Sequence, residues 1–297
     1  MTDRLLGSGL IIVDKPTGMT SHDVISRLRR IFRTRRVGHA GTLDPMATGV
    51  LVVGIERGTR FLAHLVTETK TYRATIRLGA STTTDDAESD ITSRTDTTDV
   101  TDTLIDAAIA QLTGDIMQKP AAVSAIKIDG KRAHERVRDG ETVDIPARPV
   151  TVHRFDVLDQ RSVDGYIDLD VDVFCSSGTY IRSLARDLGN VLGVGGHLTA
   201  LRRTTVGPFD LTHARTLEEL EDNPQLSLTL DQALAASFPV LRVSGEEGHK
   251  LAIGQWLEPR GLKEIHAAVT PDGRAVALVK EKGKRLATVF VARPSTL

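Results

Sequence analysis

The chain has 297 residues, of which 40% are hydrophobic and 26% charged, and its formal net charge is -1. This composition is typical of a soluble globular protein and excludes disordered, fibrous and membrane-spanning chains. The N-terminus lacks the features of a signal peptide, so we expect a cytoplasmic protein. The single cysteine, Cys175, excludes an internal disulfide and a multi-cysteine zinc site.

The near-zero net charge conceals a segregation of charge along the chain. Residues 1–60 carry 10 Lys and Arg against 5 Asp and Glu, and residues 240–297 carry 10 against 6. Residues 61–118 are acidic, with 4 against 10, and residues 216–239 hold 5 carboxylates and no Lys or Arg. Separated basic stretches can form one cationic face that binds a polyanion, or they can simply solvate different surfaces.

The N-terminal part of the chain predicts one helix and two strands. Apolar residues recur at helical spacing over residues 19–33, where Thr20 or Ser21 supplies an N-cap and arginines form the outer face. The continuous apolar run over residues 50–55 predicts a buried strand, and the alternation over residues 70–78 predicts a half-buried strand. We therefore expect part of a sheet and a helix with a basic face.

The middle of the chain predicts a polar loop and two helices. Residues 80–101 are rich in Ser, Thr and Asp and predict a long loop, and residues 102–112 predict a helix that ends before Gly114. A further helix begins at Ser177 and ends at the glycine cluster 193–196. Because phosphate-binding loops precede helices whereas this cluster follows one, we interpret it as a C-terminal cap.

Three aspartates alternate with apolar residues in the strand predicted over residues 167–173. Asp168, Asp170 and Asp172 share one face of that strand, since side chains alternate with a period of two. No further metal-ligand types are close in sequence, so we expect a solvent-exposed face and not a metal site. The acidic residues of 85–90 lack the glycine and the terminal glutamate of a calcium-binding loop.

The last part of the chain predicts a separate small domain. An acidic stretch ends at Pro239, and hairpin turn signals follow at residues 272–273 and 282–283, between short apolar strands. We therefore expect a main domain over residues 1–239 and a basic β-rich domain over residues 240–297.

The densest cluster of functional residue types surrounds a single carboxylate, Asp44. The segment 38–51 reads GHAGTLDPMATGVL and leads directly into an apolar strand. Its glycines allow the backbone to approach a ligand closely, and Pro45 holds Asp44 in an extended conformation. The pattern predicts a carboxylate that is aimed at a bound molecule, although an ordinary turn residue fits it as well.

Other catalytic classes fit the sequence poorly. It contains no G-x-S-x-G elbow, no Walker loop, no H-E-x-x-H and no dinucleotide fingerprint after a strand. Hydrolase, kinase and redox activities are therefore excluded. His39 and Asp44 are too few to hold a metal ion, so we expect His39 to contact a ligand or to stabilise the loop.

Several motifs together resemble one family. The segment GHAGTLDPMATGVL, preceded by GLIIVDKPTGMTSHDV and followed by KTYRATIRLG, is similar to the catalytic domain of bacterial tRNA pseudouridine(55) synthases of the TruB family. QKPAAVSAIKIDG from Gln118, CSSGTYIRSLARDLG from Cys175 and GGHLTALRRT from Gly195 extend the resemblance. Order and spacing agree across residues 9–209. The family usually has two prolines where this chain has Pro120 and Ala121.

The resemblance implies a fold and an activity. The implied fold is α/β in the broad sense (α+β), with a mixed, mainly antiparallel sheet. It includes an RNA-gripping insertion at about 119–150 and a C-terminal PUA-like RNA-binding domain. The activity is isomerisation of the T-loop uridine at position 55 of tRNA to pseudouridine. It needs no cofactor and no metal, and we expect the protein to act alone on the T-stem-loop. The alternatives are a tRNA-folding protein of the same fold and a guide-RNA-dependent synthase.

The resemblance also implies the site residues. Asp44 is the essential carboxylate, Arg182 pairs with it, and Tyr72 stacks on the uracil after the base has flipped out of the RNA. Asp44 attacks C1′, attacks the uracil ring or removes the 2′ proton, and the sequence does not choose among these. Residues 27–36 and 119–150 are expected to grip the RNA backbone. The predicted substrate-binding residues are Lys15, His39, Gly41, Thr42, Leu43, Tyr180 and Leu201.

Overall fold

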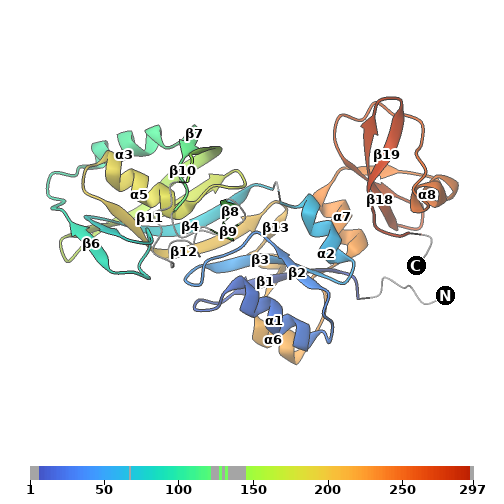
Figure 1. The fold of residues 1–297 in the computed structure, drawn as a ribbon, viewed down its shortest axis with the longest axis horizontal. Helices are drawn as coiled ribbons and strands as arrows, with labels where there is room; N and C mark the ends of the chain where they lie inside the picture. Colours follow the sequence, from blue (N-terminus) through green and yellow to red (C-terminus); the bar gives the residue numbers. More distant parts are fainter. Residues whose placement is uncertain (1–6, 67, 122–126, 129–130, 133–144, 295–297) are drawn as a thin grey trace. The chain divides into compact units, whose positions relative to one another are not determined.

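The computed structural model describes residues 7–66, 68–121, 127–128, 131–132 and 145–294 (Figure 1). The chain folds into two compact units. Unit 1 combines residues 1–66 with residues 205–297, and unit 2 consists of residues 67–204. The chain therefore leaves unit 1 once, forms unit 2, and returns to complete unit 1.

The sheet of unit 1 is built around its first strand, β1 (Gly9–Lys15). β1 pairs antiparallel with β3 (Thr48–Ile55) along its whole length, from Gly9 opposite Ile55 to Lys15 opposite Gly49. β3 is almost entirely buried, as its continuous apolar sequence predicts. Strands from both ends of the chain complete this part of the sheet: β2 (Val37–Ala40) beside β3, and β14 (Ala214–Arg215) and β15 (Leu228–Thr229) beside β1.

Helix α1 (Ser21–Ile31) confirms the helix predicted from residues 19–33. Thr20 is the N-cap and forms a capping box with Asp23, so two backbone N–H groups at the helix start are satisfied by side chains. Val24, Ile25 and Leu28 are buried. The other described helices of unit 1 before residue 240 are α2 (Gly58–Phe61), η1 (Leu62–His64), η2 (Leu211–His213), α6 (Leu217–Asp222) and α7 (Leu230–Ser237).

The C-terminal part of unit 1 has its own four-stranded sheet. Its strands, in spatial order, are β16 (Val240–Arg242), β17 (His266–Val269), β18 (Ala275–Lys282) and β19 (Arg285–Val291). The two predicted hairpins, β17–β18 and β18–β19, are confirmed. Helix α8 (Gly245–Ala252) was not predicted, because two glycines interrupt a sequence in which only Gly248 and Leu251 are buried.

The sheet of unit 2 has the order β12-β4-β11-β10-β7. β4 (Lys70–Leu78) has the bounds that its alternating sequence predicts, and it pairs antiparallel with β11 (Tyr166–Cys175). The remaining strands are β12 (Gly196–Val206), whose last two residues belong to unit 1, β10 (Arg148–Val163) and β7 (Gly114–Gln118). The mixed, mainly antiparallel α/β fold is confirmed.

The predicted helices of unit 2 are present with small shifts. Helix α3 (Asp102–Gln111) confirms the helix predicted over residues 102–112. Helix α5 (Ile181–Val191) begins four residues after the predicted start and ends before Gly193, which has a φ of +73° and serves in the chain reversal after the helix. α3 and α5 contact each other (Figure 1).

Two predictions for unit 2 were wrong. The polar segment 80–101 is not only loop, since it contains the paired strands β5 (Ala80–Thr82) and β6 (Ile91–Arg94). The aspartates of β11 do not all face solvent as predicted. Asp168 is only 4% exposed and accepts two hydrogen bonds of 2.8 Å from Arg77. The other two aspartates form cross-strand ion pairs, Asp170 with Arg161 and Asp172 with Arg154.

Two absences apply to the residues that the structure describes. None of their helices is long and apolar enough to cross a membrane. No group of three or more His, Cys, Asp or Glu side chains among them could hold a metal ion. The buried Cys175 is a free thiol in β11.

The glycine cap of α5 gives a prediction about stability. A Cβ atom at Gly189 would lie 2.1 Å from the carbonyl carbon of Gly195, so Gly189→Ala forces two backbone segments apart. We expect the free energy of unfolding to fall by about 3 kcal/mol, measured by urea denaturation. Gly245→Ala is the control, because a Cβ there meets nothing within 4 Å. Equal stability of the two variants would contradict the prediction.

Candidate functional site

The loop that carries Asp44 connects β2 to β3 in unit 1. Ser21, the first residue of α1, holds this loop through both polar atoms of Leu43. The Ser21 hydroxyl donates to the Leu43 carbonyl at 3.1 Å and accepts from the Leu43 N–H at 2.9 Å. The Ala47 N–H donates to the Asp44 carbonyl at 3.1 Å and closes the turn. Asp44 is therefore half-buried on a loop whose backbone is fixed on both sides.

Lys15 supports the same loop from the end of β1. Its side chain is fully buried, and its ammonium donates to the carbonyls of Pro16 at 2.8 Å, of Pro45 at 3.2 Å and of Met19. The Gly18 N–H also donates to the Pro45 carbonyl, at 2.9 Å. A buried ammonium is tolerated when hydrogen-bond acceptors surround it. Lys15, predicted to bind substrate, thus contacts the backbone next to Asp44.

The other predicted residues of this loop differ in exposure. Gly41 and Thr42 are exposed, and His39 on β2 is half-buried. Leu43 is only 4% exposed, so its side chain packs in the protein core. Gly41 has a φ of +77°, a conformation that favours glycine at the turn before Asp44.

Tyr72 and Leu201 lie on strands of unit 2. Tyr72 is 7% exposed and stands on β4 opposite Val173 of β11. Leu201, on β12, is 8% exposed. Both residues therefore expose little surface in the folded chain.

Tyr180 is the N-cap of α5 and is held by Gln118, the last residue of β7. The Gln118 side-chain oxygen accepts from the Tyr180 N–H at 2.8 Å, and its amide donates to the Tyr180 carbonyl at 3.1 Å. Gln118 is 1% exposed. This pair of hydrogen bonds fixes the start of the helix that carries Arg182.

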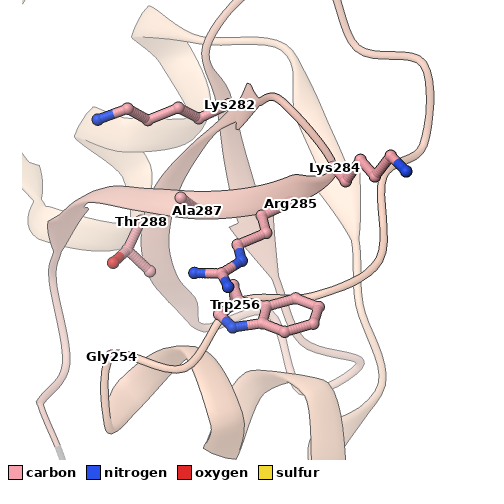
Figure 2. A pocket seen from close by; sticks show the side chains of 7 residues that line it. All are labelled: Gly254, Trp256, Lys282, Lys284, Arg285, Ala287 and Thr288. Atoms are coloured by element: carbon pink, nitrogen blue, oxygen red, sulfur yellow. The ribbon is translucent and has the colours of Figure 1, made fainter.

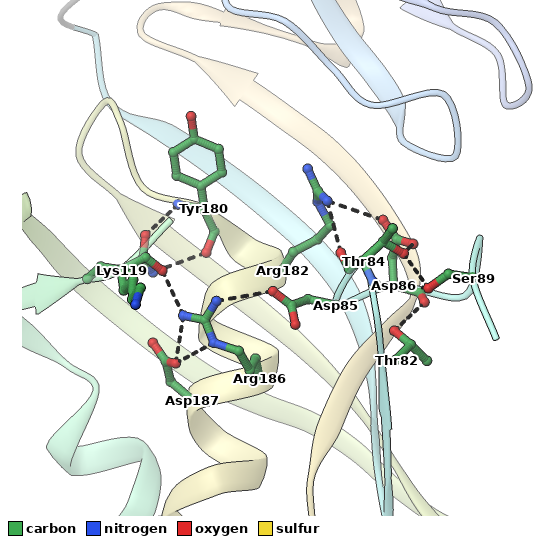
Figure 3. A network of polar contacts seen from close by, with 11 residues as sticks. Thr82, Thr84, Asp85, Asp86, Ser89, Lys119, Tyr180, Arg182, Arg186 and Asp187 are labelled. Carbon is green, nitrogen blue, oxygen red and sulfur yellow. Dashed lines mark hydrogen bonds and ion pairs between the residues drawn. The ribbon is translucent and has the colours of Figure 1, made fainter. Parts of the chain in front are cut away.

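Arg182 projects from the first turn of α5 toward the segment between β5 and β6 (Figure 3). Its Nη1 donates to the Thr84 carbonyl at 2.9 Å and lies 3.5 Å from a carboxylate oxygen of Asp86. Arg182 is 4% exposed and Asp86 is 2% exposed. The Glu88 N–H donates to Asp86 at 3.0 Å, so the carboxylate is positioned by the backbone as well as by the guanidinium.

Arg186 lies one turn further along the same face of α5. It pairs with Asp85 at 3.1 Å and with Asp187 at 2.9 Å, and it donates to the Lys119 carbonyl at 2.7 Å (Figure 3). Burial raises the pKa of Asp85, and the neighbouring guanidinium groups of Arg186 and Arg182 oppose this effect. Two adjacent carboxylates thus face two arginines spaced four residues apart.

These contacts were not predicted from the sequence. The sequence pattern relates Asp85 and Asp86 only to a calcium-binding loop, which it excludes, and Gln118 only to the start of a family motif. The available signal was the i, i+4 spacing of Arg182 and Arg186, which places both cations on one helix face. Nothing in the sequence indicates which acidic segment that face meets.

The basic segment 27–36, expected to grip RNA, is partly occupied by contacts within unit 1. Arg27 forms a bidentate pair with Glu221 of α6, at 2.7 and 2.8 Å, and a further pair with Glu218 at 3.1 Å. Arg36 pairs with Glu56 at 3.5 Å. The segment also contains exposed arginines at positions 30, 33 and 35.

A pocket of about 540 Å³ lies on the C-terminal sheet (Figure 2). Trp256 is 45% exposed, and the Arg285 guanidinium lies 4.9 Å from its ring centroid. Lys282 and Lys284 flank this stack in Figure 2. An aromatic face surrounded by cations suits a planar ring that carries a phosphate. The remaining lining residues are Gly254, Ala287 and Thr288.

The predicted site residues are divided between the two units. Unit 1 holds Asp44 with Lys15, His39, Gly41, Thr42 and Leu43, whereas unit 2 holds Tyr72, Tyr180, Arg182 and Leu201. Within unit 1, Lys15 lies next to the backbone of the Asp44 loop, and within unit 2, Tyr180 and Arg182 lie together at the start of α5. The pairing of Asp44 with Arg182 joins the two units and stays a prediction.

Three family models match the chain in succession. Residues 29–181 match the model of the TruB family pseudouridylate synthase (N terminal domain). Residues 182–236 match the tRNA pseudouridylate synthase B C-terminal domain, and residues 238–293 match the model named tRNA pseudouridine synthase II, C terminal.

Curated relatives cover the whole length. The chain is 72% identical to tRNA pseudouridine synthase B of Corynebacterium efficiens over 297 residues, which is 100% of both chains. It is 70% identical to tRNA pseudouridine synthase B of Corynebacterium diphtheriae over 300 residues, again 100% of both chains. The identity to tRNA pseudouridine synthase B of Nocardia farcinica is 58% over 289 residues, covering 97% of this chain and 94% of the relative.

Solved structures share the fold at lower identity. A chain of a Cbf5-Nop10-Gar1 complex has a TM-score of 0.74 and 27% identity, with 98% of this chain and 87% of that chain covered. A chain of an H/ACA RNP bound to a substrate RNA containing 2′-deoxyuridine has a TM-score of 0.71 and 26% identity, with 96% and 85% covered.

The contact of Asp86 with Arg182 gives a second prediction. Asp86→Ala leaves a buried guanidinium without this carboxylate, so we expect the free energy of unfolding to fall by about 3 kcal/mol in urea denaturation. Asp90→Ala, at an exposed position of the same segment, is the control and is expected to change little. An Asp86→Ala variant as stable as the control would show that the pair contributes nothing to stability.

Proposed function

Because this chain belongs to the TruB family of pseudouridylate synthases, we propose that it isomerises the T-loop uridine at position 55 of tRNA, with Asp44 as the essential carboxylate. The broader activity follows from relatives at 70 to 72% identity over the full length. The chain is a tRNA pseudouridine synthase, an isomerase that converts uridine to pseudouridine. The tRNA position and the acting residues rest on the motifs and on the geometry within each unit.

The observation that carries the role of Asp44 is the support of its loop. Lys15 and Ser21 fix the backbone on both sides of Asp44, while Asp44 itself is half-buried. A carboxylate on a rigid loop loses little freedom when it meets a substrate, which favours reaction. An ordinary turn residue does not need a fully buried ammonium beneath its loop.

The isomerisation exchanges one bond to the sugar for another. The bond between C1′ and N1 breaks, the uracil turns, a bond from C1′ to C5 forms, and a proton moves from C5 to N1. Asp44 attacks C1′, attacks the ring or removes the 2′ proton, and each route begins with an ionised carboxylate. A nearby cation keeps a partly buried carboxylate ionised.

Arg182 is the proposed cation. Its Nη1 is held by the Thr84 carbonyl and by Asp86. A guanidinium stays charged and is planar, so it can bind both oxygens of a carboxylate, which supports the proposed role of Arg182 as the partner of Asp44. In this arrangement Asp86 acts through Arg182 by fixing the direction of the guanidinium.

Tyr72, Tyr180 and Leu201 are the proposed walls of the uracil pocket. Flipping a stacked uridine out of the T loop costs a few kcal/mol. Stacking of the uracil on Tyr72 contributes about 1 to 3 kcal/mol, which offsets part of this cost. Tyr180 is suited to the same site because Gln118 fixes its backbone at the start of α5.

Recognition of tRNA requires contacts beyond one base. The exposed arginines at positions 30, 33 and 35 are proposed to contact phosphates, and the pocket around Trp256 is proposed to make the PUA-like domain, residues 240–297, an RNA-binding part of the protein. Most of the proposed RNA-gripping insertion, residues 119–150, lies outside the described residues.

The tRNA substrate itself follows from the relatives, whereas independent action in the cytoplasm is a proposal. The matched H/ACA particle contains further components, but its chain is only 26% identical to this one. The relatives named for tRNA are 70 to 72% identical. This difference favours an enzyme that acts on tRNA without a guide RNA.

Asp44→Ala tests the catalytic assignment. We expect pseudouridine formation in unmodified tRNA transcripts to fall by at least about 1000-fold, while tRNA affinity in a filter-binding assay changes little. Asp90→Ala is the control carboxylate variant. Undiminished conversion by Asp44→Ala would overturn the assignment. Mapping the modified nucleotide in the wild-type reaction tests position 55 directly.

Trp256→Ala tests the C-terminal RNA contact. Loss of one stacking surface is expected to weaken binding of full-length tRNA about tenfold. Val289→Ala removes an exposed apolar side chain of β19 that does not line the pocket, and it serves as the control. Equal tRNA affinities of the two variants would show that the pocket does not contribute to RNA binding.

A further inference from the structure

Lys70 is a buried lysine that the proposed mechanism does not use. It is the first residue of β4 and is 8% exposed. Its ammonium donates to the Glu68 carbonyl at 2.7 Å and to the Ser177 hydroxyl at 3.3 Å. Its own carbonyl accepts a contact from the Cys175 thiol at 3.7 Å. The nearly buried ammonium thus contacts a carbonyl and a hydroxyl of two partly buried residues.

The surroundings of Lys70 disfavour its charge. Burial and the neighbouring Arg203 guanidinium, which is 1% exposed, lower the pKa of Lys70 to about 8, although the Glu68 carboxylate acts in the opposite direction. Burial raises the pKa of the Cys175 thiol to about 11, so this thiol is neutral near pH 7. Burying an ammonium at this position lowers the stability of the fold. A role other than stabilising the fold would therefore account for a lysine here.

The two oxygens that Lys70 contacts lie next to proposed site residues. Glu68 precedes β4, which carries Tyr72 two residues after Lys70. Ser177 lies in the turn between β11 and α5, three residues before Tyr180 and five before Arg182. The ammonium therefore connects the start of the Tyr72 strand to the turn that presents Tyr180 and Arg182.

Other side chains hold the same turn to different strands. The Ser176 hydroxyl accepts from the Thr151 N–H of β10 at 2.9 Å, and Gln118 of β7 holds Tyr180. These contacts fix the turn relative to β10 and β7. The Lys70 contact fixes it relative to β4.

We propose that Lys70 is a positioning residue for pseudouridine formation, which sets the spacing between Tyr72 and the Tyr180–Arg182 segment by joining β4 to the turn before α5. The inference rests on the proposed function, because it takes Tyr72, Tyr180 and Arg182 as the uracil-binding and carboxylate-binding groups. A misplacement of about 1 Å in such a constellation costs up to about 100-fold in rate.

Activity and stability should respond to pH in opposite directions. As pH rises through about 8, Lys70 loses its charge in the folded protein, its hydrogen bonds weaken, and conversion should fall. In the unfolded chain this side chain has the ordinary lysine pKa of 10.5, so the unfolded chain binds more protons than the folded one between pH 8 and 10.5. Folding stability contributed by this group therefore rises over the same window.

The test compares Lys70→Met, Lys70→Arg and, as a surface control, Asp90→Ala at an exposed position of unit 2. Single-turnover conversion of unmodified tRNA, tRNA affinity and urea stability are measured from pH 6.5 to 9.5. We expect Lys70→Met to lower the conversion rate about tenfold or more, to change tRNA affinity less than about threefold, and to lose the wild-type decline above pH 8. Lys70→Arg should keep much of the rate and also lose that decline, since arginine stays charged.

Three results would overturn the inference. The first is a wild-type rate with an unchanged pH profile in Lys70→Met. The second is a loss of rate matched by an equal loss of tRNA affinity or of folded protein. The third is a Lys70→Arg variant that keeps the alkaline decline. Failure of the proposed function is separate, because it would appear as Asp44-independent conversion, or no conversion, by the protein with an intact Lys70.

Discussion

The loop around Asp44 keeps its shape because a buried ammonium is surrounded by backbone carbonyls. The Lys15 side chain extends from the end of β1 and binds the backbone of the segment before α1 and of the loop after β2. Ser21 adds a contact from the first turn of α1. A strand, a helix and a loop therefore share one tether, and the position of Asp44 depends on all three.

Unit 2 orients its cations by a different arrangement of charge. Arg182 and Arg186 on α5 face Asp86 and Asp85, so the segment after β5 is held to the helix by opposite charges. Arg182 and Asp86 are almost fully buried, which strengthens the attraction between them and penalises the loss of either, whereas Arg186 and Asp85 are partly exposed. Arg182 is thus held in place by the protein before any substrate arrives. Such preorganisation is valuable for a group that must stabilise an anion during reaction.

The sequence predicts those helices and strands whose hydrophobic pattern alone identifies them. It does not predict features that depend on residues far away in the chain. β4 and α1 can be predicted from the period-2 and helical spacing of their apolar residues, because neighbouring residues in the sequence define their buried faces. Asp168 was misplaced because its partner, Arg77, is on another strand 91 residues away. The loop of Asp44 could be singled out from its glycines and proline, whereas the Lys15 tether depends on tertiary packing. In unit 2, the spacing of Arg182 and Arg186 indicates that both lie on one helix face, whereas no local pattern indicates which acidic segment that face meets.

The interrupted layout of unit 1 affects how the chain is made. β1 leaves the ribosome early, yet β14 and β15, which flank it, are synthesised about 200 residues later. Residues 67–204 are complete before that, and they can fold as a compact body during translation. Until β14 and β15 are made, one edge of β1 lacks its neighbours, and an unpaired strand edge of this kind is prone to pair with other chains.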